Sequence, residues 1–170
     1  MKTAEFLQSK IFYFDNPDHH DDFKRKLSYW NFRGNRIVFT NGCFDILHLG
    51  HVDYLSKAAD LGDVLIVGLN SDESIHRIKG GSRPILDQTS RSMALAAFSF
   101  VTAVVLFGED TPYELIKMIQ PDILVKGGDY STDKIVGADV VKARGGHIQT
   151  IPFVEGYSTT AIENKIRKTK

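Results

Sequence analysis

The chain has 170 residues, with 21 Lys and Arg against 21 Asp and Glu, so its formal net charge is zero. This balance argues against nucleic acid or an anionic membrane as a partner, because both attract strongly basic surfaces. No apolar run approaches the ~20 residues of a membrane span, and the N-terminal stretch lacks the unbroken apolar segment of a signal peptide. The single cysteine, Cys43, excludes an internal disulfide and leads us to expect a cytoplasmic protein.

Residues 1–33 read as an extension ahead of the first strand, and 34–170 as the main domain. Within the extension, Asp21–Trp30 has the spacing of an amphipathic helix, with Phe23, Leu27 and Trp30 on one face. The acidic and histidine residues at 18–22 suit a loop that leads into a helix start. A metal site would need ligands that converge in space, and we expect no metal here.

Beyond residue 33, strand-like and helical patterns alternate. The helical patterns lie at about 51–60, 88–99, 112–119, 133–144 and 160–168. The strand-like runs are nearly continuous in apolar residues, which is typical of strands covered on both faces; they are Arg36–Thr40, Asp63–Leu69, Val101–Phe107, Asp122–Val125 and His147–Pro152. The alternation predicts an α/β fold, a Rossmann-like, doubly wound parallel sheet of about five strands.

The most informative motif is RIVFTNGCFDILHLGH at residues 36–51. A strand ends in the turn Asn41-Gly42, where the backbone can approach a ligand closely. His48 and His51 then stand at the start of a helix, whose free N–H groups and positive dipole end favour phosphate. A structural role for one of the two histidines is the alternative interpretation. The spacing favours a pair that hydrogen-bonds to charge developing on a phosphoryl group.

Three further places carry candidate chemistry at strand ends, where open α/β sheets bind ligands. Lys79-Gly80-Gly81-Ser82-Arg83-Pro84 resembles a mobile loop whose cations, together with Arg91, could close over a polyphosphate. Lys126 leaves a strand into the turn Gly127-Gly128-Asp129-Tyr130, and Ser158, Thr159 and Thr160 open the last helix. A solvated loop, a plain turn and simple capping are the respective alternatives. Cys43 has no feature that lowers a thiol pKa, so we expect it to pack.

These residues resemble a known family. Gly42–His51 matches the G-x-F-D-x-x-H-x-G-H signature of the cytidylyltransferase-like nucleotidyltransferases. Within that family the chain is similar to the adenylyltransferases of bacterial ADP-heptose synthesis, from about Arg36 to Arg167. The similarity rests on segments in the same order, namely FTNGCFDILHLGH, LIVGLNSDESI, KGGSRPI, EDTPYELI, PDILVKGGDY, IVGA and VEGYSTT.

The resemblance implies that a sugar 1-phosphate attacks the α-phosphorus of ATP and releases pyrophosphate, with Mg²⁺ on the phosphates. The expected sugar is D-glycero-β-D-manno-heptose 1-phosphate, in the synthesis of ADP-heptose for the lipopolysaccharide core. Such transfer needs positioning and charge stabilisation rather than a side-chain nucleophile. A homo-oligomer, a dimer or higher, is expected. The extension is too short for a kinase, so we expect the stand-alone form of the enzyme.

The resemblance also implies roles for individual residues. The catalytic residues would be His48, His51, Lys79 and Lys126. The nucleotide would bind to Thr40, Asn41, Gly42, Cys43, Phe44, Gly50, Lys126, Gly128, Asp129, Tyr130, Tyr157, Ser158, Thr159 and Thr160. Substrate would also contact Asp45, Asp72, Arg83 and Arg91.

Departures from the pattern bear on specificity. Relatives that use CTP and glycerol 3-phosphate tend to carry an arginine where this chain has Phe153, and M-G-D where it has Lys126-Gly127-Gly128. Both differences favour ATP. Ser99 and Thr102 replace an arginine and an acid found in many relatives, a difference that concerns the acceptor rather than the reaction.

Three alternatives stay open at this point. The first is the same chemistry with CTP and a polyol phosphate such as glycerol 3-phosphate. The second is a fragment of an aminoacyl-tRNA synthetase, which the short chain, the neutral charge and the absence of a K-M-S-K-S-like segment disfavour. The third is an inactive nucleotide sensor on the same fold, which the intact histidines, lysines and hydroxyls disfavour.

Overall fold

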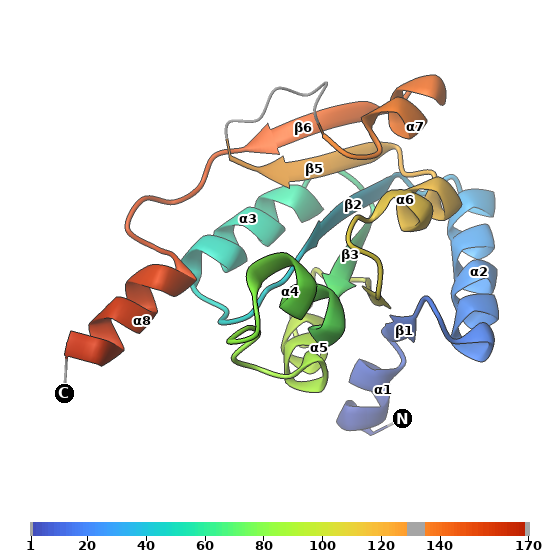
Figure 1. Ribbon diagram of the computed structural model, residues 1–170. Helices are drawn as coiled ribbons and strands as arrows, with labels where there is room; N and C mark the ends of the chain where they lie inside the picture. Colours follow the sequence, from blue (N-terminus) through green and yellow to red (C-terminus); the bar gives the residue numbers. More distant parts are fainter. Residues whose placement is uncertain (1, 129–134, 169–170) are drawn as a thin grey trace.

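The computed structural model describes residues 2–128 and 135–168 and consists of one parallel sheet with helices on both faces (Figure 1). The strands are β1 (Ile11–Tyr13), β2 (Ile37–Gly42), β3 (Val64–Asn70), β4 (Ala103–Phe107), β5 (Ile123–Gly127) and β6 (His147–Ile151). The helices are α1 (Thr3–Gln8), α2 (Pro17–Phe32), α3 (Leu49–Ala59), α4 (Asp72–Lys79), α5 (Gln88–Ala96), α6 (Tyr113–Ile119), α7 (Ala138–Ala143) and α8 (Thr159–Lys168).

The strand order β1-β4-β3-β2-β5-β6 confirms the predicted Rossmann-like sheet. All of the strand pairs are parallel, and β2 lies between β3 and β5, with Phe39 paired to Ile66 on one side and Leu124 on the other. The chain therefore changes direction across the sheet at β2. In open sheets the carboxyl ends of the strands at such a switch point form a crevice that binds ligands.

Helices cover both faces of the sheet, and each face has its own apolar core. On one face, Tyr54 and Leu55 of α3 pack with Leu95 of α5 against alternate residues of the strands. On the other face, Phe23 of α2 and Leu115 of α6 pack against the remaining strand residues. All seven residues of β3 are buried, which explains why its sequence is a continuous apolar run.

The sheet has one strand more than the expected five, and the additional strand comes from residues 1–33. Ile11 pairs with Val104, so β1 forms an edge of the sheet beside β4. Lys10 is buried, and its Nζ donates to the carbonyls of Ala96 at 2.9 Å and Phe98 at 3.1 Å, at the C-terminal end of α5. A cation is favourable there because the last carbonyls of a helix lack intrahelical partners.

Helix α2 includes the segment Asp21–Trp30, for which the spacing predicts a helix. Its N-cap is Asn16, whose side chain accepts from the amides of Asp18 and His19. Phe23 and Leu27 are buried in the second core, and Trp30 packs at its margin. The acidic and histidine residues at 18–22 thus form the first turns of this helix.

Helix α4 falls in a stretch for which the pattern predicts no regular element. Ser71 caps it by accepting from the amide of Ser74 at 3.2 Å, and its apolar side buries Ile75. The helix is short and largely polar, so its periodic signal is weak. None of the helices in the described part of the chain combines the length and the apolar character needed to cross a membrane.

The packing of α2 generates a stability prediction with a control on the same helix. Phe23 is 1% exposed, whereas Phe32 is 88% exposed. Phe23→Ala should lower the free energy of unfolding by about 3–5 kcal/mol, because it leaves a cavity in the core. Phe32→Ala should change it by less than about 0.5 kcal/mol. Urea unfolding measures both values, and equal effects would contradict the assigned packing.

Candidate active site

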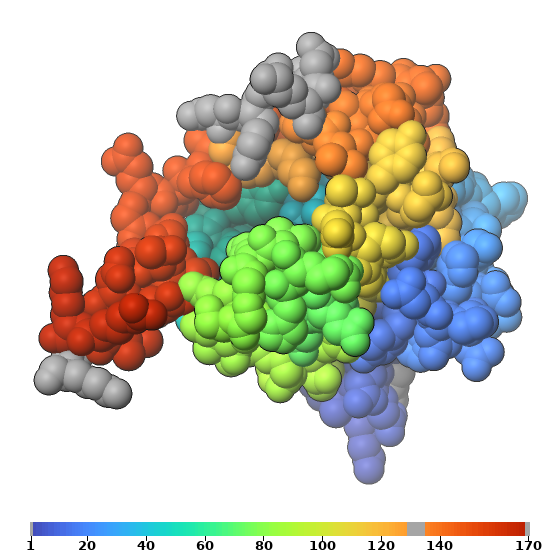
Figure 2. All heavy atoms as spheres, in the orientation of Figure 1, coloured from blue at the N-terminus to red at the C-terminus, as the bar shows by residue number. Residues whose placement is uncertain are grey.

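A cleft of about 1060 Å³ opens where β2 and β5 end, at the switch point of the sheet. Its floor is formed by the turn after β2 and the start of α3, and further residues come from α4, the end of β5 and the start of α8. Figure 2 shows the hollow between the green segment that includes α4 and the orange segment of β5 and β6. The four places singled out in the sequence meet in this cleft.

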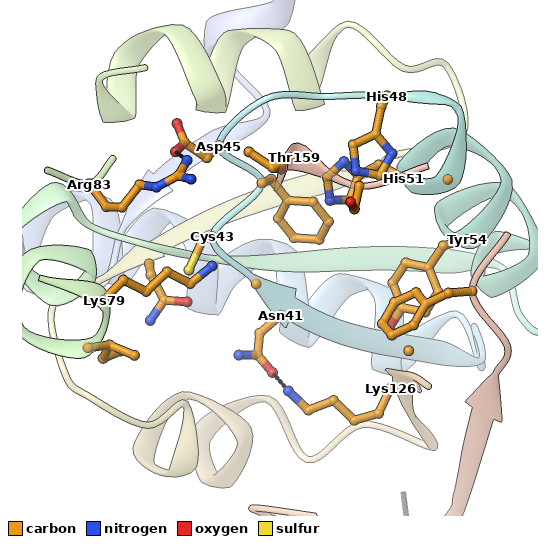
Figure 3. A pocket seen from close by; sticks show the side chains of 18 of the residues that line it. Asn41, Cys43, Asp45, His48, His51, Tyr54, Lys79, Arg83, Lys126 and Thr159 are labelled. Atoms are coloured by element: carbon orange, nitrogen blue, oxygen red, sulfur yellow. Dashed lines mark hydrogen bonds and ion pairs between the residues drawn. The ribbon is translucent and has the colours of Figure 1, made fainter. Parts of the chain in front are cut away.

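The two histidines of the opening motif lie together at the start of α3 (Figure 3). His48 is the N-cap residue, and its ring stacks on that of His51 with centroids 3.9 Å apart and planes 27° apart. Gly50 makes this arrangement possible, since a Cβ at that position would lie 3.1 Å from the His48 ring and 3.5 Å from the Cβ of Tyr157. A side chain at position 50 would therefore press against the His48 ring.

Both imidazoles favour the neutral form. Burial lowers the pKa of His48. Burial, together with the positive charges of His48 and Lys79, lowers the pKa of His51 to about 4. The Nδ1 atoms of both rings are buried without a hydrogen-bond partner. A neutral imidazole keeps one N–H donor, so the pair can donate to a ligand without adding two full charges to the cleft.

Two lysines reach the cleft from different elements. Lys126, at the end of β5, donates from Nζ to Oδ1 of Asn41 at the end of β2, and burial lowers its pKa to about 8. Lys79 is the last residue of α4 and is exposed. The lysine side chains and the histidine pair line one cavity, which is an arrangement suited to an anion with several charged oxygens.

Buried hydroxyls fix the strand ends beneath the cleft. The Thr40 hydroxyl lies 2.5 Å from that of Tyr54, which in turn donates to the carbonyl of Val125 at 3.2 Å. Burial raises the pKa of Tyr54 to about 12. This chain of contacts joins β2, α3 and β5, so the side chain of Thr40 supports the floor of the cleft rather than lining it.

The turn between β2 and α3 is held by Phe44 and Asp45. Phe44 has a positive φ of 45°, a conformation that costs a non-glycine residue about 1–2 kcal/mol. Its ring lies against Gly42 and 5.4 Å from the His51 ring, centroid to centroid. Asp45 is buried and accepts from the amides of Ile85 and Leu86 at 2.8 and 2.9 Å.

Asp45 stays ionised despite its burial. Burial alone would raise the pKa of its carboxyl, but the hydrogen bonds from Leu86, Ile85 and the Arg83 guanidinium outweigh burial and hold the pKa below its ordinary value. The ion pair between Arg83 and Asp45 is 3.0 Å long. Although Asp45 borders the cleft, its carboxylate is already occupied by donors from the protein.

Arg91 and Asp72, which were expected to contact substrate, have structural roles instead. Arg91 is 1% exposed, and its guanidinium donates to Asp72 at 2.7 Å and to the carbonyls of Cys43 at 2.6 Å, Asn70 at 2.9 Å and Leu86 at 3.0 Å. Neither side chain borders the cleft. A charge this deeply buried requires a partner for each donor, and the protein supplies the partners.

The last helix presents its first turn to the cleft. Tyr157, Ser158, Thr159 and Thr160 all border the cavity. The Ser158 hydroxyl accepts from the amide of Ala161 at 3.1 Å, so it caps the helix. Capping and phosphate binding are compatible here, because the remaining hydroxyls and N–H groups of the first turn stay available.

The structure brings together most of the residues predicted for the site. The predicted residues that border the cleft are Asn41, Gly42, Cys43, Phe44, Asp45, His48, Gly50, His51, Lys79, Arg83, Lys126, Tyr157, Ser158, Thr159 and Thr160. The side chains of Thr40, Asp72 and Arg91 and the residue Gly128 do not border it, and Asp129 and Tyr130 lie outside the described residues. Cleft residues that the sequence did not reveal include Tyr54, Asn70, Asp110 and Val136.

The missed residues lack a local signal. Tyr54 reads as a core residue of a helix, and Asn70 reads as the end of a strand. Asp110 and Thr111 belong to a turn before α6 that suggests only helix capping. The positions of Asn70 and Asp110 in the cleft follow from the sheet order, since β3 lies beside β2 and β4 lies beside β3. Residues of this kind can be assigned to the cleft only when the order of the strands in the sheet is known.

Comparison with known proteins establishes the family. The cytidylyltransferase-like family profile matches residues 39–165, so the chain belongs to the cytidylyltransferase-like family, as the motifs indicate. The bifunctional protein HldE of Nitratiruptor sp. is 62% identical over 135 residues, which are 79% of this chain and 28% of that protein. HldE of Wolinella succinogenes is 53% identical over 147 residues, 86% of this chain and 30% of that protein. The chain spans less than a third of these two relatives' length.

Solved structures support the same placement. The lipopolysaccharide core biosynthesis protein from Thermoplasma volcanium has a TM-score of 0.57 and 30% identity, over 74% of this chain and all of that protein. The pantoate-β-alanine ligase of Francisella tularensis has a TM-score of 0.58 at 16% identity, over 93% of this chain and 78% of that one. The second likeness concerns the fold alone.

The histidine pair generates a prediction about pH. Between the folded pKa of about 4 and the ordinary value of 6.5, the unfolded chain binds a proton at His51 more readily than the folded chain does. Acidification through that window therefore favours unfolding, and stability should rise with pH across it. His51→Gln should remove about 1 kcal/mol of the stability difference between pH 7 and pH 5, a value that allows for partial exposure of the ring.

Urea unfolding at the two pH values measures this difference. The matched control is His76→Gln, because that ring lies exposed on α4, and its pH profile should follow that of the wild type. If His51→Gln also followed the wild-type profile, the assigned protonation state of His51 would be wrong.

The buried guanidinium generates a second prediction. Arg91→Met should lower the free energy of unfolding by about 3–5 kcal/mol, because it leaves the Asp72 carboxylate and three carbonyls without their donor. The control is Arg77→Met, which breaks the exposed pair with Asp110 and should cost less than about 1 kcal/mol. Thermal unfolding of both variants decides whether Arg91 is structural, and a mild effect at Arg91 would restore its expected role at the substrate.

Proposed function

We propose that the chain is an adenylyltransferase that joins ATP and a sugar 1-phosphate into an ADP-sugar and pyrophosphate. The observation that carries this proposal is the convergence of His48, His51, Lys79, Lys126 and the start of α8 on one cleft at the switch point of the sheet. The acceptor we propose is D-glycero-β-D-manno-heptose 1-phosphate. It is supported by the similarity to HldE proteins and to a lipopolysaccharide core biosynthesis protein.

In the proposed reaction an oxygen of the sugar phosphate attacks the α-phosphorus of ATP. The bond between that phosphorus and the bridging oxygen to the β-phosphorus breaks, and the electron pair leaves with pyrophosphate. Negative charge grows on the oxygens around the α-phosphorus. The stacked imidazoles of His48 and His51 can donate to those oxygens, a contribution worth most in the transition state. No covalent enzyme intermediate is required.

The remaining groups would hold the substrates. Lys126 has a pKa of about 8 and is thus mostly charged at neutral pH, so it can pair with phosphate while Asn41 orients it. Lys79 would add a second cation from α4. The hydroxyls and free N–H groups at the start of α8 would receive the leaving pyrophosphate. Together these contacts place the reacting atoms and offset their charge.

Mg²⁺ would enter with ATP, held by phosphate oxygens and water. Within the described residues, no group of three or more His, Cys, Asp or Glu side chains could hold a metal. Of the cleft carboxylates, Asp45 is engaged by Arg83 and two amides, and Asp110 is paired with Arg77. The donor set therefore fits a metal bound mainly by its nucleotide, where it would help offset the charge of the triphosphate.

The preference for ATP over CTP rests on the residues around the end of β5. The Phe153 ring lies so close to Gly127 that a Cβ there would approach it to 2.5 Å, and Phe153 is nevertheless 65% exposed. One side of the Phe153 ring thus lies against the backbone of Gly127, and the rest of the ring is open for a nucleotide base to stack on. A purine offers more stacking surface than a pyrimidine, which supports the adenylyl reaction over the cytidylyl alternative.

We also propose a cytoplasmic location and a homo-oligomer. Cys43 is a free thiol that borders the cleft, and a reducing compartment would keep it so. The oligomeric state stays a prediction from the sequence.

The test of the proposed function is pyrophosphate release by the purified chain with ATP or CTP against a panel of sugar 1-phosphates and glycerol 3-phosphate. We expect turnover with ATP and the heptose 1-phosphate. His48→Ala and His51→Ala should each lower kcat roughly 10²-fold, as for loss of one transition-state donor, while circular dichroism stays that of the wild type.

The controls separate the alternatives. His76→Ala removes a histidine from α4 outside the cleft and should leave kcat unchanged. Turnover with CTP and glycerol 3-phosphate alone would make the chain a cytidylyltransferase. Binding of ATP by calorimetry without turnover of any acceptor would identify a nucleotide sensor instead.

A further inference from the structure

Helix α8 lies beside the cleft but has little apolar packing against the rest of the protein. Its first turn borders the cleft, yet none of its described residues is buried. In Figure 1 the helix projects away from the sheet and its end points into open space. Apolar burial, which fixes α2, α3, α5 and α6, therefore does little to set the orientation of α8. Some other interaction must decide where its first turn lies.

A shielded ion pair links α8 to the rest of the chain. The guanidinium of Arg83 forms an ion pair with Glu163, in the second turn of α8. The same guanidinium pairs with Asp45 through its other terminal nitrogen. The side chains are 21% exposed for Arg83, 18% for Glu163 and 7% for Asp45, so this cluster is far better shielded than a typical surface pair. Shielding and a forked donor both strengthen such pairs.

The Asp45 side of this ion-pair cluster is held firmly by the rest of the protein. Asp45 lies three residues before His48 and is fixed by the amides of Ile85 and Leu86. Its lowered pKa keeps it ionised. A continuous series of contacts thus runs from the turn that carries the catalytic histidines, through Arg83, to Glu163 on α8. This series connects the helix that carries the hydroxyls with the turn that precedes His48.

We propose that Arg83 and Glu163 act as positioning residues, a latch that holds the first turn of α8 over the cleft. The identity of the anion received there rests on the proposed function, but the latch itself does not. Arg83 was expected from the sequence to bind substrate. In the structure both of its terminal nitrogens face carboxylates, which offset its charge and leave it a poor phosphate ligand.

The latch and the substrate-ligand interpretations make opposite predictions for one substitution. If Arg83 bound phosphate, removing the charge of Glu163 would free the guanidinium and tighten ATP binding. If the pair is a latch, Glu163→Gln releases α8 and weakens ATP binding. We expect the KM for ATP to rise about fivefold while kcat changes less than about twofold, the size expected for one shielded ion pair.

The direct test follows the backbone of α8 by hydrogen exchange in the full chain without substrate. Glu163→Gln should speed exchange at the amides of residues 161–168 about fivefold and leave α3 unchanged. Arg83→Ala should do the same, and the double variant Arg83→Ala with Glu163→Ala should be no faster than Arg83→Ala alone. Effects that simply add would show that the two residues act independently and would overturn the latch.

The matched control is Glu114→Gln, which alters one carboxylate of the exposed pair with Lys117 on α6 and should change neither exchange at α8 nor the KM. Arg83→Lys is a second variant, because one ammonium cannot span both carboxylates; it should also speed exchange at α8. Unchanged exchange at α8 in all Arg83 and Glu163 variants would overturn the proposal. Faster exchange in a chain that turns over no substrate would support the latch and refute the proposed function separately.

Discussion

The buried guanidinium of Arg91 is the interaction on which the architecture of the cleft depends. It joins the carbonyls at the turn after β2, at the end of β3 and before α5, and it is neutralised by Asp72 at the start of α4. Backbone carbonyls at strand ends need donors when they are buried. One side chain supplies donors to three such carbonyls and to the Asp72 carboxylate, and the loops that carry Phe44, Asp45 and the histidine pair are built around it.

The two walls of the cleft differ in how they are held. The wall that carries His48 and His51 rests on Arg91, on the Thr40–Tyr54 contact and on the apolar core beneath α3. The wall formed by α8 buries none of its described residues and is linked to the rest of the chain by the ion pair between Arg83 and Glu163. Groups that stabilise a transition state gain from being fixed before substrate arrives. In the proposed reaction the start of α8 receives pyrophosphate and then releases it, and a modest attachment suits that task.

The sequence predicted the five central and C-terminal strands, most of the helices except α1 and α4, and the convergence of the histidines with Lys126 and Ser158. These follow from continuous local patterns and from the edge at which parallel strands end. The sequence could not separate a buried arginine from a ligand-binding one, as Arg91 demonstrates, because burial is a property of the fold. It also missed β1, since three apolar residues carry no periodicity, and the Arg83–Glu163 pair, since its partners are far apart along the chain. Residues Asp129 and Tyr130 remain predictions.

The place of β1 has a consequence for the order in which the chain folds. Ile11 is synthesised well before its partner Val104, which belongs to a strand much further along the chain. Neighbouring strands throughout this sheet are parallel, so no tight hairpin can nucleate them. Closing such large loops slows folding. Strand β1 can therefore join the sheet only after β4 has been made, and it does so as an edge strand.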